Sequence, residues 1–487
     1  MLTLICGLPL PQIVASDAKP INVLLITLDD MNRDSVGVYG ASVPDATPNI
    51  DRLAAQGLRF EHAHVTIAIC QPTRAVWMTG RYPHNNGALG FNNINPGVPT
   101  LPETLRRHGY LTGILGKTEH VVPSRKDAFS YRQPRTALEN GRSEQRYGEF
   151  ASEFLSQAKE NGKPFFLMVN THDPHRPFDN RKPAERRRPL KVTEQKNKNG
   201  RVRVGYQGDY PVPSKIYTPE EIPVPGFLPD VPAIRQEIAQ YYSSVRRADD
   251  VAGRILQELD DAGFRENTLV MLKSDHGIAV PFAKTNVYRH STLTPWIVRW
   301  PNVVPPGSVD DQHLVSGIDL APTILEAVGL PPLEGSDGRS LVPLLRGETQ
   351  PERDFVFTHI NTLSSGRSYA MRSVQTKRFG LIWNAWCDGT TEFKNESMSG
   401  LTWKAMQKAA ASDPKIAARV ELFQHRVPFE LYDYQSDPDA LKNLIDDPRH
   451  AATVSELSQR LGRLMQDTND PQAEAYHKAV HQRAAVE

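Results

Sequence analysis

The chain has 487 residues with 57 Lys and Arg against 56 Asp and Glu, so its formal net charge is +1. This balance excludes a protein whose binding rests on global charge, such as a coat for nucleic acid. Hydrophobic residues make up 39% and charged residues 23%, which is ordinary for a globular protein with a sizeable core and excludes disorder throughout. Three cysteines are too few for a disulfide framework, and their spacing matches no zinc-binding pattern.

The first twenty residues are interpreted as a targeting remnant. Residues 1–15 are apolar but are interrupted by Pro9 and Pro11, and residues 14–16 offer a small-residue exit. These features favour export to a secreted or periplasmic location, with a frayed cytosolic terminus as the alternative. No apolar run approaches the roughly 18 to 20 residues of a membrane helix, so we expect no membrane partner. The balanced net charge leads us to expect no nucleic acid as a partner either.

Buried strands and helices alternate from residue 21 onward. Residues 21–28 (INVLLITL) form a nearly continuous apolar run, which suits a strand buried on both faces of a parallel sheet. Helices are predicted from Pro48 to Gly57 and from Thr100 to Gly109 by their start and stop signals. Further strands are predicted at residues 110–115, 164–170, 268–273 and 296–300, and a long amphipathic helix at residues 232–262. The alternation predicts a large three-layer α/β domain over residues 21–353, with a mixed, mostly parallel sheet.

The pattern of the sequence changes near residue 354. Short alternating segments at residues 353–360, 369–374, 379–383 and 429–432 are typical of an antiparallel sheet, and an amphipathic helix follows at residues 454–465. We therefore predict a smaller C-terminal α+β domain over residues 354–487.

One stretch, from Arg181 to Arg203, contains ten basic and two acidic residues. Its simplest interpretation is a solvated loop. The alternative is an electropositive rim that attracts an anionic polymer.

Carboxylates directly follow two of the predicted buried strands. Asp29 and Asp30 come after the strand at residues 21–28, and Asp275 with His276 comes after the strand at residues 268–273. Open α/β sheets place ligand sites at this edge, and neighbouring carboxylates repel one another unless a cation joins them. Because oxygen ligands favour Ca²⁺ or Mg²⁺, the sequence predicts a divalent-cation site here. A helix cap or a solvated turn is the alternative.

A third motif, Cys70-Gln71-Pro72-Thr73-Arg74, lies where a helix is predicted to begin at Pro72 and to end at Gly80. Free backbone N–H groups and the helix dipole favour an anion beside Cys70, and Arg74 adds a positive charge one turn further on. A small buried hydrophobe is the alternative interpretation of a lone cysteine.

The C-x-P-x-R string resembles the signature of the type I sulfatases, a family of the alkaline phosphatase superfamily. The resemblance runs from about residue 22 to residue 443 and includes the ELYD pattern at residues 430–433. It implies that a formylglycine-generating maturase oxidises Cys70 to formylglycine. One hydroxyl of the hydrated aldehyde would attack sulfur, and the other would allow sulfate to be released. The resemblance also implies one bound Ca²⁺, with the ligands Asp29, Asp30, Cys70, Asp275 and, where the family more often has asparagine, His276.

Further family motifs follow two other predicted strands. The stretch from Gly116 to His120 (GKTEH) resembles the family's G-K-x-H motif with one additional residue. The resemblance implies that Lys117 contacts sulfate and formylglycine. It also implies that His120, if a bulge absorbs the insertion, is the base that deprotonates the second hydroxyl. A surface lysine is the alternative for Lys117.

The motif His172-Asp173-Pro174-His175-Arg176 and a distant lysine complete the expected set. The resemblance implies that His175 contacts the bridge atom of the substrate and donates a proton to the leaving group. Asp173 and Arg176 are expected to bind substrate, and Lys284 is expected to bind sulfate from the opposite side. His172 is interpreted as structural.

The resemblance implies a hydrolase that removes sulfate from a sulfated sugar. Residues 172–176, 227–232 and 371–375 are most similar to members that cleave N-sulfoglucosamine in heparan sulfate, a glycosaminoglycan. The alternatives are an O-sulfatase on another sulfated glycan, a phosphonate or phosphodiester hydrolase of the same superfamily, and a catalytically silent glycan-binding protein. The expected partners are the sulfated saccharide, the maturase and a second copy of the chain in a homodimer.

Overall fold

Eight strands form the sheet that positions the candidate site, and β1 (Asn22–Leu28) lies in its interior with every residue buried. The structure, a computed structural model, describes residues 20–180, 190–196 and 202–485. β1 pairs in parallel with β5 (Phe165–Asn170) on one side and β8 (Thr268–Ser274) on the other. The order of the sheet is β10 (Ser308–Ser316), β2 (Leu58–His64), β9 (Trp296–Arg299), β8, β1, β5, β3 (Leu111–Leu115) and β4 (Tyr131–Gln133), with β9 antiparallel to both neighbours.

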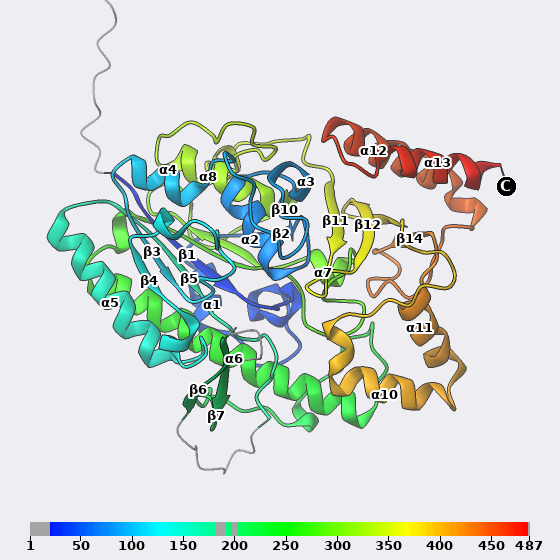
Figure 1. Cartoon of the computed structure of the whole chain (residues 1–487), viewed down its shortest axis with the longest axis horizontal. Helices are drawn as coiled ribbons and strands as arrows, with labels where there is room; N and C mark the ends of the chain where they lie inside the picture. The colour runs from blue at the N-terminus through cyan, green and yellow to red at the C-terminus, as the bar shows by residue number, and fades with distance from the viewer. Residues whose placement is uncertain (1–19, 181–189, 197–201, 486–487) are drawn as a thin grey trace, which may run out of the picture.

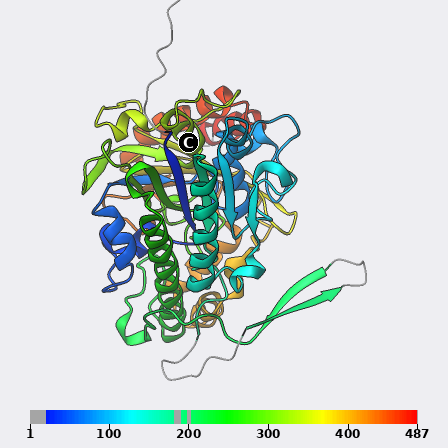
Figure 2. The same ribbon diagram turned by 90° about the vertical axis from the view of Figure 1, so that its left-hand side faces the viewer.

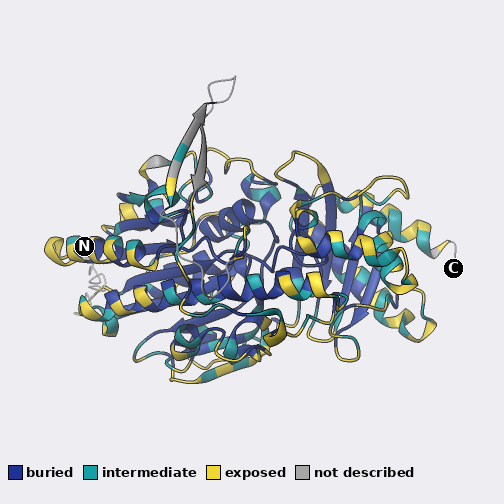
Figure 3. Cartoon of the chain, turned by 90° about the horizontal axis from the view of Figure 1, so that it is seen from below, coloured by how far each residue is buried: buried dark blue, intermediate teal, exposed yellow. Residues whose placement is uncertain are grey.

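Helices cover both faces of this sheet, as the alternating apolar side chains of β1 require (Figure 1). Leu24 and Ile26 lie in one core and Val23 and Leu25 in the other. The first core is completed by α1 (Pro48–Ala54), α5 (Glu144–Asn161) and α6 (Pro232–Asp261), and the second by α2 (Cys70–Thr79), α4 (Leu101–Arg107) and α8 (Leu320–Ala327). Figure 3 shows buried strands enclosed by helices whose outer sides are exposed. The predicted three-layer α/β architecture is confirmed.

The second sheet is antiparallel, with its strands in chain order (Figure 1). Its strands are β11 (Val356–Thr362), β12 (Ser368–Gln375), β13 (Phe379–Asn384) and β14 (Phe429–Asp433). Leu381 and Leu431 pack on one face in a core with α12 (Ala451–Asp467) and α13 (Ala473–Ala484). Ile382 and Tyr432 belong to the same core as α6, together with α10 (Leu401–Ala410) and α11 (Pro414–His425). The predicted antiparallel sheet and its helix are confirmed, and the boundary at residue 353 stays a prediction.

The basic stretch contributes to a hairpin that projects from the body of the molecule (Figure 2). Its strands are β6 (Lys191–Lys196) and β7 (Val202–Gln207). The solvated loop predicted here is therefore wrong for the described part of the stretch, because β-branched residues such as Val192, Val202 and Val204 favour extended strands. Residues 181–189 and 197–201 lie outside the described residues.

The remaining α-helices of the described residues are short, namely α3 (Pro83–Asn86), α7 (Arg289–Thr292) and α9 (Val342–Leu345), and short 3₁₀ helices lie between the other elements. Within the part of the chain that the structure describes, no helix combines the length and the apolar character needed to span a bilayer.

The parallel register brings the carboxyl ends of three strands to one edge. Leu28 of β1 lies opposite Ser274 of β8, and Thr27 lies opposite Asn170 of β5. The backbone pairing continues past the strands, since Asp275 N–H donates to Leu28 at 3.1 Å and Asp29 N–H donates to Asp173 at 3.2 Å. The acidic residues and the segment after β5 therefore emerge side by side.

Candidate active site

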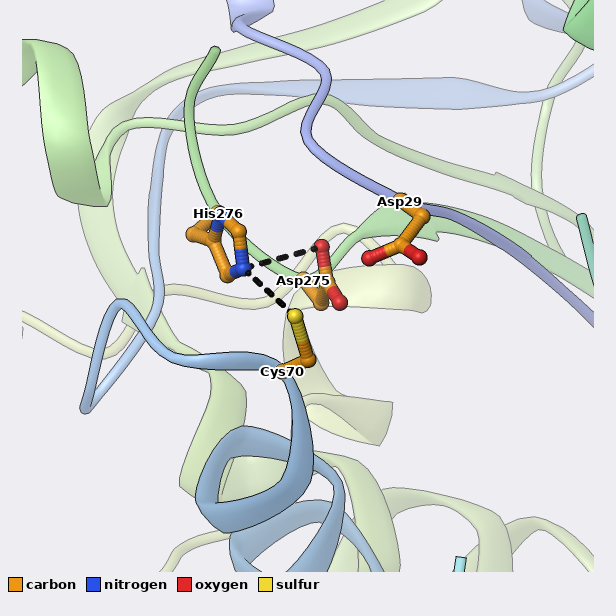
Figure 4. A group of neighbouring side chains, drawn as sticks. All are labelled: Asp29, Cys70, Asp275 and His276. Atoms are coloured by element: carbon orange, nitrogen blue, oxygen red, sulfur yellow. Dashed lines mark hydrogen bonds and ion pairs between the residues drawn. The ribbon is translucent and has the colours of Figure 1, made fainter. Parts of the chain in front are cut away.

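Three aspartates form the acidic part of this edge. Asp29, Asp30 and Asp275 are all fully buried. The backbone turns sharply after β1, with φ of 69° at Asp30, and the N–H of Asp30 donates to Asp275 Oδ1 at 3.0 Å. One ligand atom each from Asp29, Cys70, Asp275 and His276 lies within 4.8 Å of the others (Figure 4). The predicted convergence of the two strand ends is thus present in the structure.

Each aspartate faces a basic side chain from a different segment. Lys117 pairs with Asp29, Lys284 Nζ lies 2.9 Å from Asp30 Oδ2, and Arg74 Nη1 lies 2.7 Å from Asp275 Oδ2. Three carboxylates therefore face three basic groups, and all six side chains are almost completely buried.

The pKa values of Asp29 and Asp275 are shifted in opposite directions, because the two carboxylates have different charged neighbours. Burial works to raise the pKa of Asp29, but the charges of Lys117 and His175 hold it well below its usual range. Burial and the negative charge of Asp29 raise the pKa of Asp275. The pair is therefore costly to ionise fully without further positive charge.

The residues at this edge fit a divalent cation. Among the described residues, Asp29 Oδ1 and Asp30 Oδ1 have no hydrogen-bond donor although both are buried. His276 Nδ1 lies 3.0 Å from the Gly277 carbonyl and must donate to it. This bond leaves the Nε2 lone pair facing Cys70 Sγ at 3.2 Å and Asp30 Oδ1 at 3.4 Å. A backbone carbonyl commonly fixes a metal-binding histidine in this way, so His276 is available as a nitrogen ligand beside the oxygen ligands.

Cys70 lies at the first turn of α2 and lines a cavity. The helix begins at Cys70 itself, with Ile69 as its N-cap, two residues before the predicted start at Pro72. Burial raises the pKa of the Cys70 thiol. The cavity has a volume of about 270 Å³ and is lined also by Phe91, Lys284 and Glu396. The predicted placement of Cys70 at a helix N-terminus beside positive charge agrees with the structure.

Lys117 and His120 lie on the turn after β3. Lys117 has φ of 50°, and the His120 N–H donates to the Lys117 carbonyl at 2.9 Å, so a tight turn accommodates the additional residue. Burial, Lys117 and Arg74 hold the pKa of His120 well below its usual range. His120 is therefore neutral at physiological pH, as a general base must be, and its ring packs edge-on against Phe91.

His172 and His175 stack on each other, with ring centroids 4.7 Å apart. His172 Nδ1 lies 3.4 Å from Asp29 Oδ2, so the histidine interpreted as structural touches the acidic edge directly. His175 Nδ1 donates to the Arg176 carbonyl at 2.7 Å, and its Nε2 lies 3.5 Å from Glu396 Oε1. The His175 ring therefore presents Nε2 toward the cavity side of the site.

Asp173 and Arg176 have contacts that differ from the predicted substrate binding. Asp173 is 1% exposed, and its carboxylate accepts from Arg142 and, at 2.6 and 3.0 Å, from Arg247. Arg176 Nη1 pairs with Glu237 at 2.6 Å, and Nη2 donates to the Ala279 carbonyl at 2.8 Å. Both side chains are occupied by the protein itself, so the contacts favour a positioning role, and substrate binding stays a prediction.

Arg142, Arg247 and Glu396 are residues around the site that sequence reasoning missed. None of them lies in a motif, and each comes from a segment far along the chain from its partner. From the sequence, a charged residue in the middle of α6, such as Arg247, is expected on the solvent-exposed face of the helix. The structure shows that Arg247 is buried.

The comparisons with known proteins identify the family. The model of the sulfatase family matches residues 21–330, and a model described as "N-sulphoglucosamine sulphohydrolase, C-terminal" matches residues 275–393. The chain therefore belongs to the sulfatase family, and the predicted family and hydrolase class are confirmed.

Among its relatives, human N-sulphoglucosamine sulphohydrolase is 33% identical over 476 residues, covering 93% of this chain and 91% of that protein. Human arylsulfatase A is 26% identical and covers 88% and 84%.

Solved structures share the fold. A protein in complex with its substrate D-glucosamine-2-N,6-O-disulfate superposes with a TM-score of 0.67 at 20% identity, covering 93% of this chain and 99% of that one. Phosphonate monoester hydrolase of Agrobacterium radiobacter has a TM-score of 0.63 at 22% identity, covering 92% and 96%. At these identities the likeness concerns the fold, which hydrolases of both sulfur and phosphorus substrates use.

Proposed function

We propose that the chain is a formylglycine-dependent sulfatase that removes the N-linked sulfate from a terminal N-sulfoglucosamine of a glycosaminoglycan. The observation that carries this proposal is the 33% identity to human N-sulphoglucosamine sulphohydrolase over 93% of the chain. The set of buried acids and bases around Cys70 supports the sulfatase part of the proposal independently.

The acidic edge is assigned to the metal. Asp29, Asp30, Asp275, His276 and the modified residue 70 would hold one Ca²⁺, which supplies Lewis-acid polarisation of the sulfate oxygens. Since three carboxylates already face three basic groups, a divalent cation gives the set an excess of positive charge. That excess favours the anionic sulfate and frees Lys117 and Lys284 to contact it.

Two histidines are assigned to proton transfer. His120 is assigned to take a proton at the residue 70 position, because burial, Lys117 and Arg74 keep its ring neutral. His175 is assigned to deliver a proton to the leaving nitrogen through Nε2 in the doubly protonated form of its ring, because its Nδ1 proton is held by the Arg176 carbonyl. Burial and Lys284 lower the pKa of His175, which disfavours that form. An amine leaving group needs this proton more than a phenolate does, since a free amide anion is a very poor leaving group.

Formylglycine at position 70 would supply the nucleophile, and its second hydroxyl would allow release of sulfate. A maturase is therefore proposed as a partner. Export to a secreted or periplasmic location, a homodimer and the domain boundary at residue 353 remain predictions.

The decisive experiment compares kcat/KM on glucosamine N-sulfate, glucosamine 6-sulfate and a simple aryl sulfate. We expect the N-sulfate to be hydrolysed fastest. A much faster reaction with the 6-sulfate would disprove the N-sulfate assignment and leave the sulfatase class intact. A phosphonate or phosphodiester that outperforms all three would move the proposal to that branch of the superfamily.

The modification is tested by peptide mass spectrometry after co-expression with a maturase. The peptide with Cys70 should show conversion of the thiol to the aldehyde, while the peptide with half-buried Cys387 should remain unmodified. Cys70→Ser should stall after at most one turnover, and Cys387→Ser should retain full activity. An unmodified Cys70 in a fully active preparation would contradict the proposal.

A further inference from the structure

Glu396 is an acid at the cavity that none of the family motifs includes. It begins the short 3₁₀ helix η8 (Glu396–Ser399), which follows β13 and precedes α10 in the chain. Its Oε2 lies 2.9 Å from Lys284 Nζ, and its Oε1 lies 3.5 Å from His175 Nε2. Glu396 therefore touches both the lysine assigned to sulfate and the histidine assigned to the leaving atom.

Lys284 pairs with Asp30 as well as with Glu396, so two carboxylates face this one lysine. The Glu396 side chain is 41% exposed, unlike the fully buried acids at the edge of the sheet. Among the described residues that line the cavity with Cys70, Glu396 is the one acid. An acid on the open side of an anion-binding cavity weakens sulfate binding unless it recognises another part of the substrate.

The size of the cavity limits which part of the substrate Glu396 can contact. Its volume of about 270 Å³ is close to the roughly 300 Å³ at which small-molecule sites begin, which suits one sugar and its sulfate. With sulfate beside Cys70 and Lys284, a group near His175 Nε2 is the bridge between sulfur and sugar. Glu396 Oε1 is within 3.5 Å of the same Nε2.

We infer that Glu396 recognises the N–H of the sulfamate bridge and so distinguishes an N-sulfate from an O-sulfate, an inference that rests on the proposed function. A sulfamate nitrogen carries a hydrogen that it donates, whereas the bridging oxygen of a sulfate ester only accepts. An ionised carboxylate accepts only. The N-sulfate therefore gains a charge-assisted hydrogen bond, whereas the O-sulfate places an acceptor against an acceptor.

Two basic neighbours favour the ionised form of the carboxylate. Although burial works to raise the pKa of Glu396, Lys284 and His175 hold it well below its usual range. When Lys284 turns toward sulfate, one Glu396 oxygen is left free for the substrate N–H.

The test compares the wild type with Glu396→Gln and Glu396→Met, which weaken and then remove the acceptor at nearly constant length. The matched control is Glu421→Gln, which removes an exposed carboxylate that pairs with His425 and does not line the cavity. For the N-sulfate we expect kcat/KM to fall about 10- to 100-fold in both Glu396 variants, more in Met than in Gln, from the size of a hydrogen bond to a charged group. For the 6-sulfate we expect a change within about twofold, and no change in the control with either substrate.

A second measurement does not depend on turnover. In a Cys70→Ala background with Ca²⁺, calorimetry gives Kd for glucosamine N-sulfate and glucosamine 6-sulfate with Glu396 intact or replaced. Loss of affinity for the N-sulfate alone supports the inference. Equal losses for both sugars would overturn it, because they would show that Glu396 only positions Lys284 and His175. A wild type that hydrolyses O-sulfates but not the N-sulfate would overturn the proposed function itself.

Discussion

Two buried clusters of charge are neighbours at the same edge of the main sheet, where the Asp29 N–H donates to the Asp173 carbonyl. They differ in how many of their carboxylate oxygens accept a hydrogen bond. In the first, Asp173 accepts from Arg142 and Arg247, and Arg247 also donates to Asp179 and, at 2.8 Å, to the Pro211 carbonyl. In the second, Asp29 and Asp30 keep carboxylate oxygens without a donor among the described residues.

The difference separates scaffold from site. Both clusters pair acids with bases and both are buried, so burial and charge alone do not distinguish them. The hydrogen bonds do, because a buried polar atom without a partner costs free energy that a ligand can recover. The first cluster should therefore govern stability, and the second should govern metal binding and turnover.

The largest effect is expected for Asp29→Asn. Loss of the carboxylate removes a ligand from the cation site, and the several kcal/mol of transition-state stabilisation that a metal supplies corresponds to a fall in kcat/KM of about 10³-fold or more. Added Ca²⁺ should raise the Tm of the wild type but not of this variant. Thermal melts with and without a chelator, together with sulfate release, measure both.

The control for this prediction is Asp34→Asn, which changes an exposed aspartate five residues away that pairs with Arg33. It should leave activity and the response to Ca²⁺ unchanged. Full activity of the Asp29 variant after chelation, with no metal found by elemental analysis, would contradict the cation site.

The next effect is on stability, in the other cluster. Arg247→Met leaves Asp173 and Asp179 short of a buried partner, and breaking a buried ion pair from one side costs about 3–5 kcal/mol. The Tm should fall clearly, whereas Arg339→Met, in an exposed pair with Glu352, should cost at most about 1 kcal/mol. If both variants melt alike, the network around Asp173 does not hold the scaffold.

A smaller effect, of opposite sign, is expected at Lys273. Its amine is buried between Trp296 and Trp77, at 3.5 and 4.8 Å from the ring centroids, and has no hydrogen-bond partner among the described residues. Replacement by the apolar Met removes an uncompensated polar group, which should raise stability by about 1 kcal/mol despite the lost ring contacts. A lower Tm would show that the amine remains charged and that the two rings stabilise it.

Much of the fold could be predicted because its strands are continuous apolar runs. β1, β5 and β8 are buried along their whole length, so composition alone marks them. β10, at the sheet edge, is exposed or half-buried over its first six residues and buried only over its last three, so it gives no such signal. α5 does have signals that could have revealed it, namely the cap at Ser143, the stop at Gly162 and the buried Tyr147 and Phe154 at helical spacing.

The residues of the candidate site also divide into those that could be predicted from the sequence and those that could not. Asp29, Asp30 and Asp275 could be placed together from the sequence because parallel strands bring their carboxyl ends to one edge. Glu396 could not, because its approach to Lys284 depends on how the second sheet and α10 pack against the first core. Asp173 was expected at the substrate because it lies in a motif, and only the fold shows that two arginines already occupy its oxygens.

The register between β1 and β8 also restricts where the chain can gain or lose residues. Since Leu28 lies opposite Ser274, the spacing of Asp29 from Asp275 is set by two strands with no loop between strand and carboxylate. One inserted residue in either strand would advance a carboxylate by about 3.3 Å and turn it to the other face of the sheet. The turn from Lys117 to His120 closes through a backbone hydrogen bond around its two intervening residues, so a change of length there is absorbed locally. Length variation is therefore expected in the turn between Lys117 and His120, and is excluded from the strands that carry the acids.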